Sequence, residues 1–303
     1  MNKNSINKNG CTQSPTLHQL ITYILYFPNI LNCFFLISLL DYYAIHFTIL
    51  GILTLMSIIS SVKTTLSRPI DQFIIQQYKA QVQGQHFDNG SNKLESFCEI
   101  CNAYVQENTK HCRNCDRCCQ GFDHHCKWIN NCVGNLNYNL FIFMITSTLF
   151  LFMYTMLIYI SIIVLYQTNY ETLLIDNELQ KFHFTKENDL NVKYILSIVM
   201  LGDSTLIVIL MLQLLLFHIY LIIKGTTTYD FIMKSQFKKI LPQFQIGPQT
   251  FQNASKTTQK VIHEIYGLAK KNTLVEITQN QHKMIPDKQT IQDETIIENQ
   301  IQA

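Results

Sequence analysis

The stretch that decides the fold of this 303-residue chain is CEICNAYVQENTKHCRNCDRCCQGFDHHCKWINNC, residues 98–132. It contains eight of the ten cysteines of the chain, together with His111, His124 and His125. A disulfide framework is typical of a small secreted domain, whereas Cys and His residues at ligand spacing indicate a metal site. The stretch therefore predicts a metal-binding segment.

The number of possible ligands in this stretch exceeds what metal binding needs. Zinc is usually held by four tetrahedral Cys and His ligands, often as Cys-x2-Cys pairs. Two such sites use eight ligands, and the stretch offers eleven. A purely structural domain has little use for the remaining three, so the surplus points to chemistry.

The surplus includes a cysteine with a histidine and an aspartate just before it, in the order Asp123, His124 and Cys126. A thiol becomes a strong nucleophile when a neighbouring base favours the thiolate. A carboxylate bonded to an imidazole fixes its tautomer and stabilises its protonated form. We expect metal ligands at His125 and Cys132 to hold the backbone on both sides of Cys126.

Four apolar runs are long enough to cross a bilayer, which takes about 20 residues. They are Leu20–Leu40, Ile45–Val62, Leu140–Leu165 and Ile195–Ile223. Only 15% of the residues are charged, whereas a soluble domain usually has about 25%. The sequence predicts an all-α membrane protein with four transmembrane helices. A cytosolic zinc-binding Cys-rich domain, made mostly of short β-hairpins and loops, lies between helices 2 and 3.

Two polar residues in the fourth run stand out. Ser204–Ile223 alone could span, so we expect Asp203 at the membrane boundary, although an intramembrane carboxylate is a functional candidate. His218 lies near the cytosolic end of the run, and we expect a packing residue whose polar tip reaches water.

Basic residues set the expected orientation. Segment 67–139 has seven Lys or Arg, whereas loop 41–44 has none and segment 166–194 has three. Loops rich in Lys and Arg stay in the cytosol, so both termini and the Cys-rich segment should be cytosolic. We detect no internal repeat. The expected parts are a cytosolic N-terminus 1–19, transmembrane helices 20–66, the zinc domain 67–139, transmembrane helices 140–223 with a lumenal loop near 166–194, and a mostly disordered cytosolic tail 224–303 with weak helical periodicity around Val261–Leu268.

At these residues the chain resembles the DHHC-type protein S-acyltransferases, or palmitoyltransferases. The Cys-rich domain of that family has the order C-x2-C-x9-H-C-x2-C-x2-C-x4-D-H-H-C-x5-C-x4-N-x3-F. This sequence matches every element, from Cys98 to Asn137 and Phe141. The arrangement of two spans on each side of the domain also matches.

The resemblance implies a role for each matched position. Cys126 would take the acyl group from acyl-CoA, such as palmitoyl-CoA, with His124 as the base and Asp123 as its orienting carboxylate. Thr228 would support Asp123. Two structural zinc ions would have alternating ligand sets, one of Cys98, Cys101, His111 and Cys118, the other of Cys112, Cys115, His125 and Cys132.

Three other residues of the stretch are expected to be structural. Trp128 and Asn131 fall in the W-x-x-N-C pattern of the family, and Cys119 is expected to be a small apolar filler. Two departures from the family pattern bear on how the domain docks on the helices. The usual Asp-Pro-Gly after span two is Arg68-Pro69-Ile70 here, and the usual Thr-Thr-x-Glu after span four is Thr227-Thr228-Tyr229-Asp230.

The resemblance also implies the partners and the location. Acyl-CoA, membrane lipid, and protein substrates that bear cysteine in the membrane or at its cytosolic face are expected. A net charge of +2 gives no indication of nucleic acid. The expected location is a multi-pass position in an endomembrane (Golgi or ER) or the plasma membrane.

Two other functions fit parts of the sequence. A zinc-stabilised module that only binds partners would leave Asp123, His124 and Cys126 unexplained. A transporter or channel with a zinc-bound gate could use Asp203 and His218 as ion-pathway residues.

Overall fold

The computed structural model describes residues 9–86, 95–168 and 186–240. The chain divides into two compact units, Met1–Phe231 and Ile232–Ala303. The first unit contains the long helices and the Cys-rich segment.

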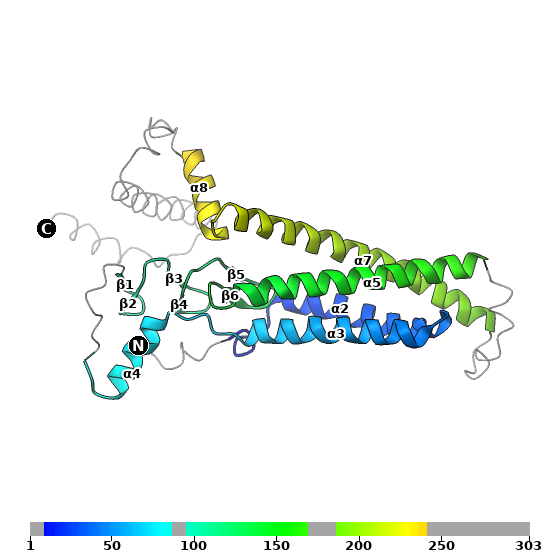
Figure 1. Cartoon of the computed structure of the whole chain (residues 1–303), viewed down its shortest axis with the longest axis horizontal. Coiled ribbons are helices and arrows are strands. Elements are labelled where there is room, and N and C mark those ends of the chain that lie inside the picture. Colours follow the sequence, from blue (N-terminus) through cyan, green and yellow to red (C-terminus); the bar gives the residue numbers. More distant parts are fainter. Residues whose placement is uncertain (1–8, 87–94, 169–185, 241–303) are drawn as a thin grey trace, which may run out of the picture. The chain divides into compact units, whose positions relative to one another are not determined.

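Within the described residues, four helices are long and apolar enough to cross a membrane (Figure 1). They are α2 (Leu17–Leu36), continued by the 3-10 turn η1 (Ile37–Leu39), α3 (Tyr43–Leu66), α5 (Tyr138–Thr168) and α7 (Lys186–Ile223). Large apolar side chains such as Ile24 and Leu31 point outward, 69% and 73% exposed, as a lipid-facing surface requires. The predicted four spans are confirmed, and the chain is a multi-pass membrane protein.

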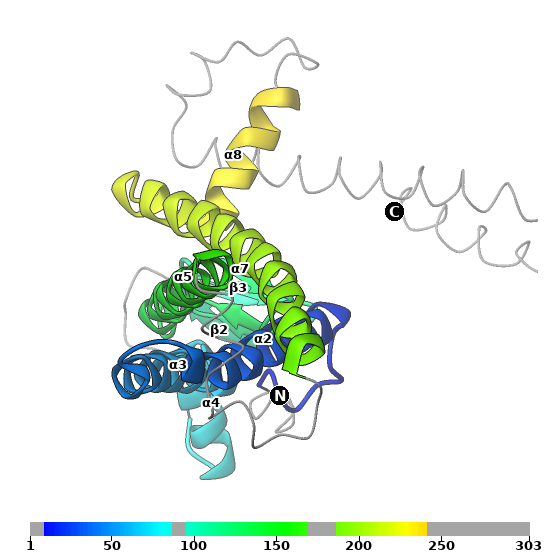
Figure 2. The ribbon, with the colours of Figure 1, turned by 90° about the vertical axis from the view of Figure 1, so that its right-hand side faces the viewer.

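The four helices pack side by side (Figure 2), with α5 against α3 and α7, and α2 against the other three. Between α3 and α5, hydroxyl groups pair at 2.9 Å (Ser57 with Thr148) and 3.0 Å (Ser60 with Ser147). Small side chains let helices approach closely in a membrane, and their hydroxyls bond across the interface because no water satisfies them. These pairs fix the position of α5, which begins just after the Cys-rich segment.

A second polar contact joins α2 to α7. The Asn29 amide donates to the Asp203 carboxylate at 2.8 Å and to the Ser204 hydroxyl at 2.9 Å. The Tyr159 hydroxyl donates to the Asn29 carbonyl at 2.6 Å. The candidate span Leu190–Ile223 contains Asp203, but it is longer than the roughly 20 residues that cross a bilayer, so the boundary position stays a prediction. The amide partner offsets the cost of a carboxylate in an apolar setting.

The Cys-rich segment folds into short antiparallel hairpins at one end of the helices (Figure 1). The strand pairs are β1 (Glu95–Cys98) with β2 (Ala103–Gln106), β3 (Lys110–Cys112) with β4 (Arg117–Cys119), and β5 (His124–Cys126) with β6 (Asn131–Val133). Each pair turns through four residues. The last residue of each turn is Asn102, Asp116 or Asn130, with φ of 49°, 51° and 51°. Asn and Asp tolerate this left-handed conformation better than most residues.

The three hairpins form an internal repeat. Each first strand ends in a cysteine that pairs across the turn, and these cysteines, Cys98, Cys112 and Cys126, recur every 14 residues. The expectation of no internal repeat is wrong. The three hairpins share a strand register, but the residues between these cysteines differ, so the sequence does not show the repeat.

The helix α4 (Gln72–Val82) attaches the first hairpin to the end of α3 through a buried carboxylate, Asp71. Asp71 accepts from the backbone N–H of Phe73 at 2.8 Å and of Gln106 at 2.9 Å, and from the Thr109 hydroxyl. It caps the N-terminus of α4 and orders β2 at the same time. The departure at Arg68-Pro69-Ile70 is therefore followed directly by a carboxylate that holds the domain.

After α7, the short helix α8 (Thr228–Ile240) was not expected from the sequence. It begins where the Thr227 hydroxyl accepts from the Asp230 N–H at 3.1 Å and donates to the Asp230 carboxylate at 2.9 Å. The remaining tail, including Val261–Leu268, and most of the predicted lumenal loop lie outside the described residues.

Replacing Asp71 with alanine should destabilise the fold. The variant leaves two backbone N–H groups and the Thr109 hydroxyl without their acceptor, at about 1–3 kcal/mol for a buried unsatisfied group. We expect the midpoint of thermal unfolding in detergent to fall by about 5–10 °C. Glu107→Ala, which removes an exposed carboxylate from the same hairpin, serves as the control. Equal midpoints for the two variants would contradict this account.

Candidate functional site

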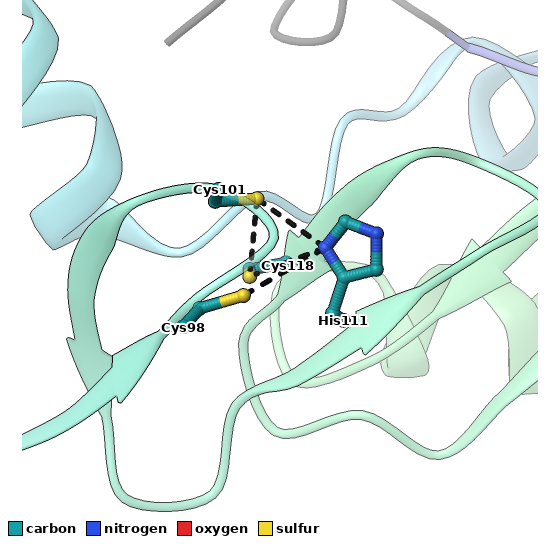
Figure 3. Close-up of side chains that lie close together, drawn as sticks. All are labelled: Cys98, Cys101, His111 and Cys118. Atoms are coloured by element: carbon teal, nitrogen blue, oxygen red, sulfur yellow. Dashed lines mark hydrogen bonds between the residues drawn. The ribbon is translucent and has the colours of Figure 1, made fainter. Parts of the chain in front are cut away.

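The first group of possible metal ligands joins the first hairpin to the second (Figure 3). It consists of Cys98, Cys101, His111 and Cys118. The His111 Nδ1 atom lies 3.3, 3.7 and 3.9 Å from the sulfur atoms of Cys101, Cys118 and Cys98. The Cys101 and Cys118 sulfur atoms are 3.5 Å apart.

The second group joins the second hairpin to the third in the same way. It consists of Cys112, Cys115, His125 and Cys132. The His125 Nδ1 atom lies 3.3, 3.7 and 4.0 Å from the sulfur atoms of Cys115, Cys112 and Cys132. The Cys115 and Cys132 sulfur atoms are 3.3 Å apart.

Both groups fit zinc. Bonds of about 2.3 Å to sulfur and 2.0–2.1 Å to nitrogen in a tetrahedron place ligand atoms roughly 3.5–3.8 Å apart, and the observed separations cluster around these values. Bonds between the sulfur atoms lower the pKa of one thiol in each group, Cys101 and Cys115. The same bonds raise the pKa of their partners Cys118, Cys112 and Cys132, so the thiols of each group share protons.

Among the described residues, Cys126 belongs to neither group. It occupies the register position of Cys98 and Cys112, but the residue three positions later is Ile129 instead of a cysteine. Cys126 is 7% exposed and packs with Ile129, Phe141 and apolar residues of α5 and α7. The third hairpin therefore carries a thiol in a ligand position without a partner ligand.

His124 and Asp123 form a bonded pair beside this thiol. The His124 Nδ1 atom and an Asp123 carboxylate oxygen are 2.7 Å apart. Burial lowers the pKa of His124, but its bond to Asp123 and the nearby Cys126 sulfur outweigh this and raise the pKa to about 9. Burial raises the pKa of Asp123, but bonds from His124 and Thr228 produce a net lowering.

The pair is therefore charged at neutral pH. Because the pKa of His124 is raised from its ordinary 6.5, its contribution to stability is complete below about pH 6.5 and disappears as the pH rises through about 9. The Asp123 contribution is complete above its ordinary value of 3.8. It is lost as the pH falls through the lowered pKa of that carboxyl.

The start of α8 holds Asp123 from the other side. The Thr228 backbone N–H donates to the Asp123 carboxylate at 2.8 Å, and the Tyr229 N–H donates to the Asp123 backbone carbonyl at 3.0 Å. The buried Thr228 hydroxyl lies close enough to favour the charged carboxylate, but its geometry falls short of a hydrogen bond. The support expected from Thr228 thus comes mainly from its backbone, at the N-terminus of a helix where anions are favoured.

Residues 91–235 match the protein family described as DHHC palmitoyltransferase. The chain carries the domain of this family over these residues. It is 30% identical over 185 residues to the probable protein S-acyltransferase 20 of Arabidopsis thaliana, a match that covers 60% of this chain and 25% of that protein. It is 39% identical over 85 residues to palmitoyltransferase ZDHHC4 of Mus musculus, covering 28% of this chain and 23% of that protein. The chain thus spans about a quarter of the length of these DHHC relatives.

The sequence did not indicate that His218 of α7 lies beside the DHHC motif. It is 1% exposed, which confirms the expected packing role, but its tip does not reach water. Its ring centroid lies 5.8 Å from that of His124 and 5.1 Å from that of Phe141. Its Nδ1 atom is 3.0 Å from the Tyr138 hydroxyl. A polar residue at helical spacing in an apolar run was the available signal, but only tertiary packing brings it to the site.

Asn131 and Trp128 have different surroundings. The Asn131 amide donates to the carbonyls of Thr64 and Thr65 at the end of α3, at 3.1 and 3.0 Å. Trp128 is half-exposed, and its ring meets that of His18 edge-on at 5.1 Å. Cys119 is fully buried and lies outside both ligand groups of the described residues.

The chain before α2 holds the turn that follows the DHHC motif, which the sequence did not indicate. The Thr16 hydroxyl donates to the Lys127 carbonyl at 2.7 Å. A side chain at Gly10 would meet the Ile129 carbonyl at 2.3 Å, so only glycine fits this contact. The third hairpin is thus fixed by α3, α8 and the N-terminal segment together.

Replacing Thr228 with proline should isolate the backbone bond to Asp123. Thr228 is the first residue of α8, where proline fits a helix because its N–H is not needed by the helix itself. Losing a hydrogen bond to a charged group should lower the free energy of unfolding by about 1.5–3 kcal/mol, measured by denaturation in detergent at neutral pH. Thr228→Val keeps the N–H and serves as the control. The account fails if the proline variant is as stable as the valine variant.

Proposed function

We propose that this chain is a protein S-acyltransferase that moves a long-chain acyl group, such as palmitoyl, from acyl-CoA to protein cysteines. The observation that carries the proposal is the Cys126 thiol, which lies outside both ligand groups and next to His124, itself bonded to Asp123. The match to the family and the names of the relatives support the same reaction.

The proposed reaction has two steps. The Cys126 sulfur, whose proton His124 already holds, attacks the thioester carbon of acyl-CoA as the thiolate. The bond from that carbon to the CoA sulfur breaks, and the CoA thiolate takes up the proton. A substrate cysteine then passes its proton to His124 and attacks the acyl-enzyme, which releases the Cys126 sulfur. Each step exchanges one thioester for another, so acceleration depends on thiolate formation and positioning.

The surroundings of Cys126 suit a lipid substrate. The thiol packs with Phe141 and Ile145 of α5, next to Met211 and Leu214 of α7. These side chains offer an acyl chain the apolar contact it needs. The CoA head, which is charged, would remain on the side of the hairpins.

We further propose that zinc fills both ligand groups, with Cys98, Cys101, His111 and Cys118 at one site and Cys112, Cys115, His125 and Cys132 at the other. Zinc bound there would supply folding energy directly by linking hairpins that are too short to hold together alone.

The proposed topology follows the basic residues. The termini and the Cys-rich domain 67–139 would face the cytosol, with the loop near 166–194 in the lumen. The substrates would be cysteine-bearing proteins in the membrane or at its cytosolic face. The enzyme would be located in the Golgi, the ER or the plasma membrane.

An acyl-enzyme on Cys126 can be detected directly. Cells supplied with a clickable fatty acid should label the protein through a hydroxylamine-sensitive bond, and Cys126→Ser should abolish the label. Cys11→Ser, which removes an exposed thiol, should keep it. A thioester label that persists in Cys126→Ser would contradict the proposal.

The adjacent histidines should have separable roles. His125→Ala removes one ligand of the second group, so the variant should lose about one zinc per chain and unfold more readily. His124→Ala should retain both metals but load acyl groups more slowly by roughly 10²–10⁴, the range for general acid–base catalysis.

Elemental analysis and acyl loading on the same preparations check both expectations. Equal zinc loss in the two variants, or full activity of His124→Ala, would contradict the assigned roles. The family assignment would stand in either case.

A further inference from the structure

The residues of the proposed mechanism all come from the third hairpin and α8, yet a side chain from the membrane helices reaches the same place. His218 is fully buried near the end of α7 that lies beside the hairpins, against His124 and Phe141. The Tyr138 hydroxyl lies 3.0 Å from its Nδ1 atom, and the ring also packs against Phe217. A buried polar ring of this kind calls for a physical account.

The spacing of this cluster would admit a metal ion. Ligand atoms of Asp123, His124 and His218 all lie within 4.8 Å of one another. Every member already has a hydrogen-bond partner, however. Asp123 has His124 and Thr228, His124 has Asp123, and His218 has Tyr138. A metal would also compete for a nitrogen of the proposed base.

We propose that His218 is a positioning residue that holds the His124 ring in line with Asp123 and Cys126. The proposal rests on the function proposed above. The rings of Phe141 and His218 lie 5.3 and 5.8 Å from the ring of His124 and form its wall toward the helices. One bond at Nδ1 leaves the imidazole free to pivot about that contact, and the wall removes this freedom.

The effect of removing the wall follows from packing. His218→Ala leaves a gap of nearly a whole imidazole in a buried site, into which His124 can turn or water can enter. Displacement of a catalytic group by about 1 Å can cost a factor of about 10² in rate. The loss should fall on the acyl-loading step and not on acyl-CoA binding, because the residue acts through His124.

The experiment measures single-turnover acyl loading of the full chain in detergent, across a range of palmitoyl-CoA concentrations. We expect His218→Ala to lower the maximal loading rate by roughly 10- to 100-fold. The half-saturating concentration should change by less than about threefold, and zinc content should stay unchanged. His218→Gln, which can restore a polar group near the position of the His218 Nε2 atom, should recover part of the rate. Leu216→Ala, on the exposed face of the same helix, should load at the native rate.

A double-mutant cycle decides whether His218 acts through His124. If it does, adding His218→Ala to His124→Ala should slow loading no further, because the group it positions is already gone. An equal loss in both backgrounds, loss of zinc from His218→Ala, or a native rate in that variant would overturn the proposal. If His124→Ala alone loads normally, the base assignment fails as well. If Cys126→Ser keeps the fatty-acid label described above, the proposed acyl-enzyme fails instead.

Discussion

The short hairpins of the Cys-rich segment are not stable on their own. The constraint on which the site depends is that successive hairpins contribute possible metal ligands to the same group. Strands of three or four residues are too short to be stable alone in water. Each ligand group takes its Cys-x2-Cys pair from one hairpin and its His and last Cys from the next. The links therefore run from the first hairpin to the third, and no further hairpin follows the third within the described residues. Its ligand-position cysteine, Cys126, is the one left over.

Membrane helices complete what the ligand groups begin. The Asn131 amide satisfies backbone carbonyls at the end of α3, which have no partner within the helix. The backbone of α8 supplies N–H donors to Asp123 on the opposite side. The third hairpin is thus tied both to the helix before the Cys-rich segment and to the chain after the last span. Docking of the domain and orientation of its carboxylate are one structural event, because the same hairpin carries both.

The sequence was sufficient for features that depend on local composition or fixed spacing. Long apolar runs define the four spans, and Cys and His spacing indicates metal sites. The division of the ligands into two alternating groups came from the resemblance to the family. It was insufficient where tertiary contacts decide. His218 is surrounded in sequence by lipid-facing residues, and only the packing of α7 on α5 turns it toward His124. The repeat was missed for a different reason, since Ile129 replaces the cysteine that would have revealed a third Cys-x2-Cys pair.

That replacement has two physical consequences that reinforce each other. Without a second thiol at position 129, the third hairpin lacks the pair of cysteines that could hold a metal in the first two, so the Cys126 sulfur keeps its lone pairs available. The isoleucine also belongs to the buried apolar cluster of Cys126, Phe141 and Ile145, which limits the access of water to the thiol. In such surroundings the charged bond between His124 and Asp123 is stronger than it would be in solvent. One side chain thus distinguishes the hairpin of the proposed nucleophile from the two that offer Cys-x2-Cys ligands, while its backbone remains that of its two neighbours.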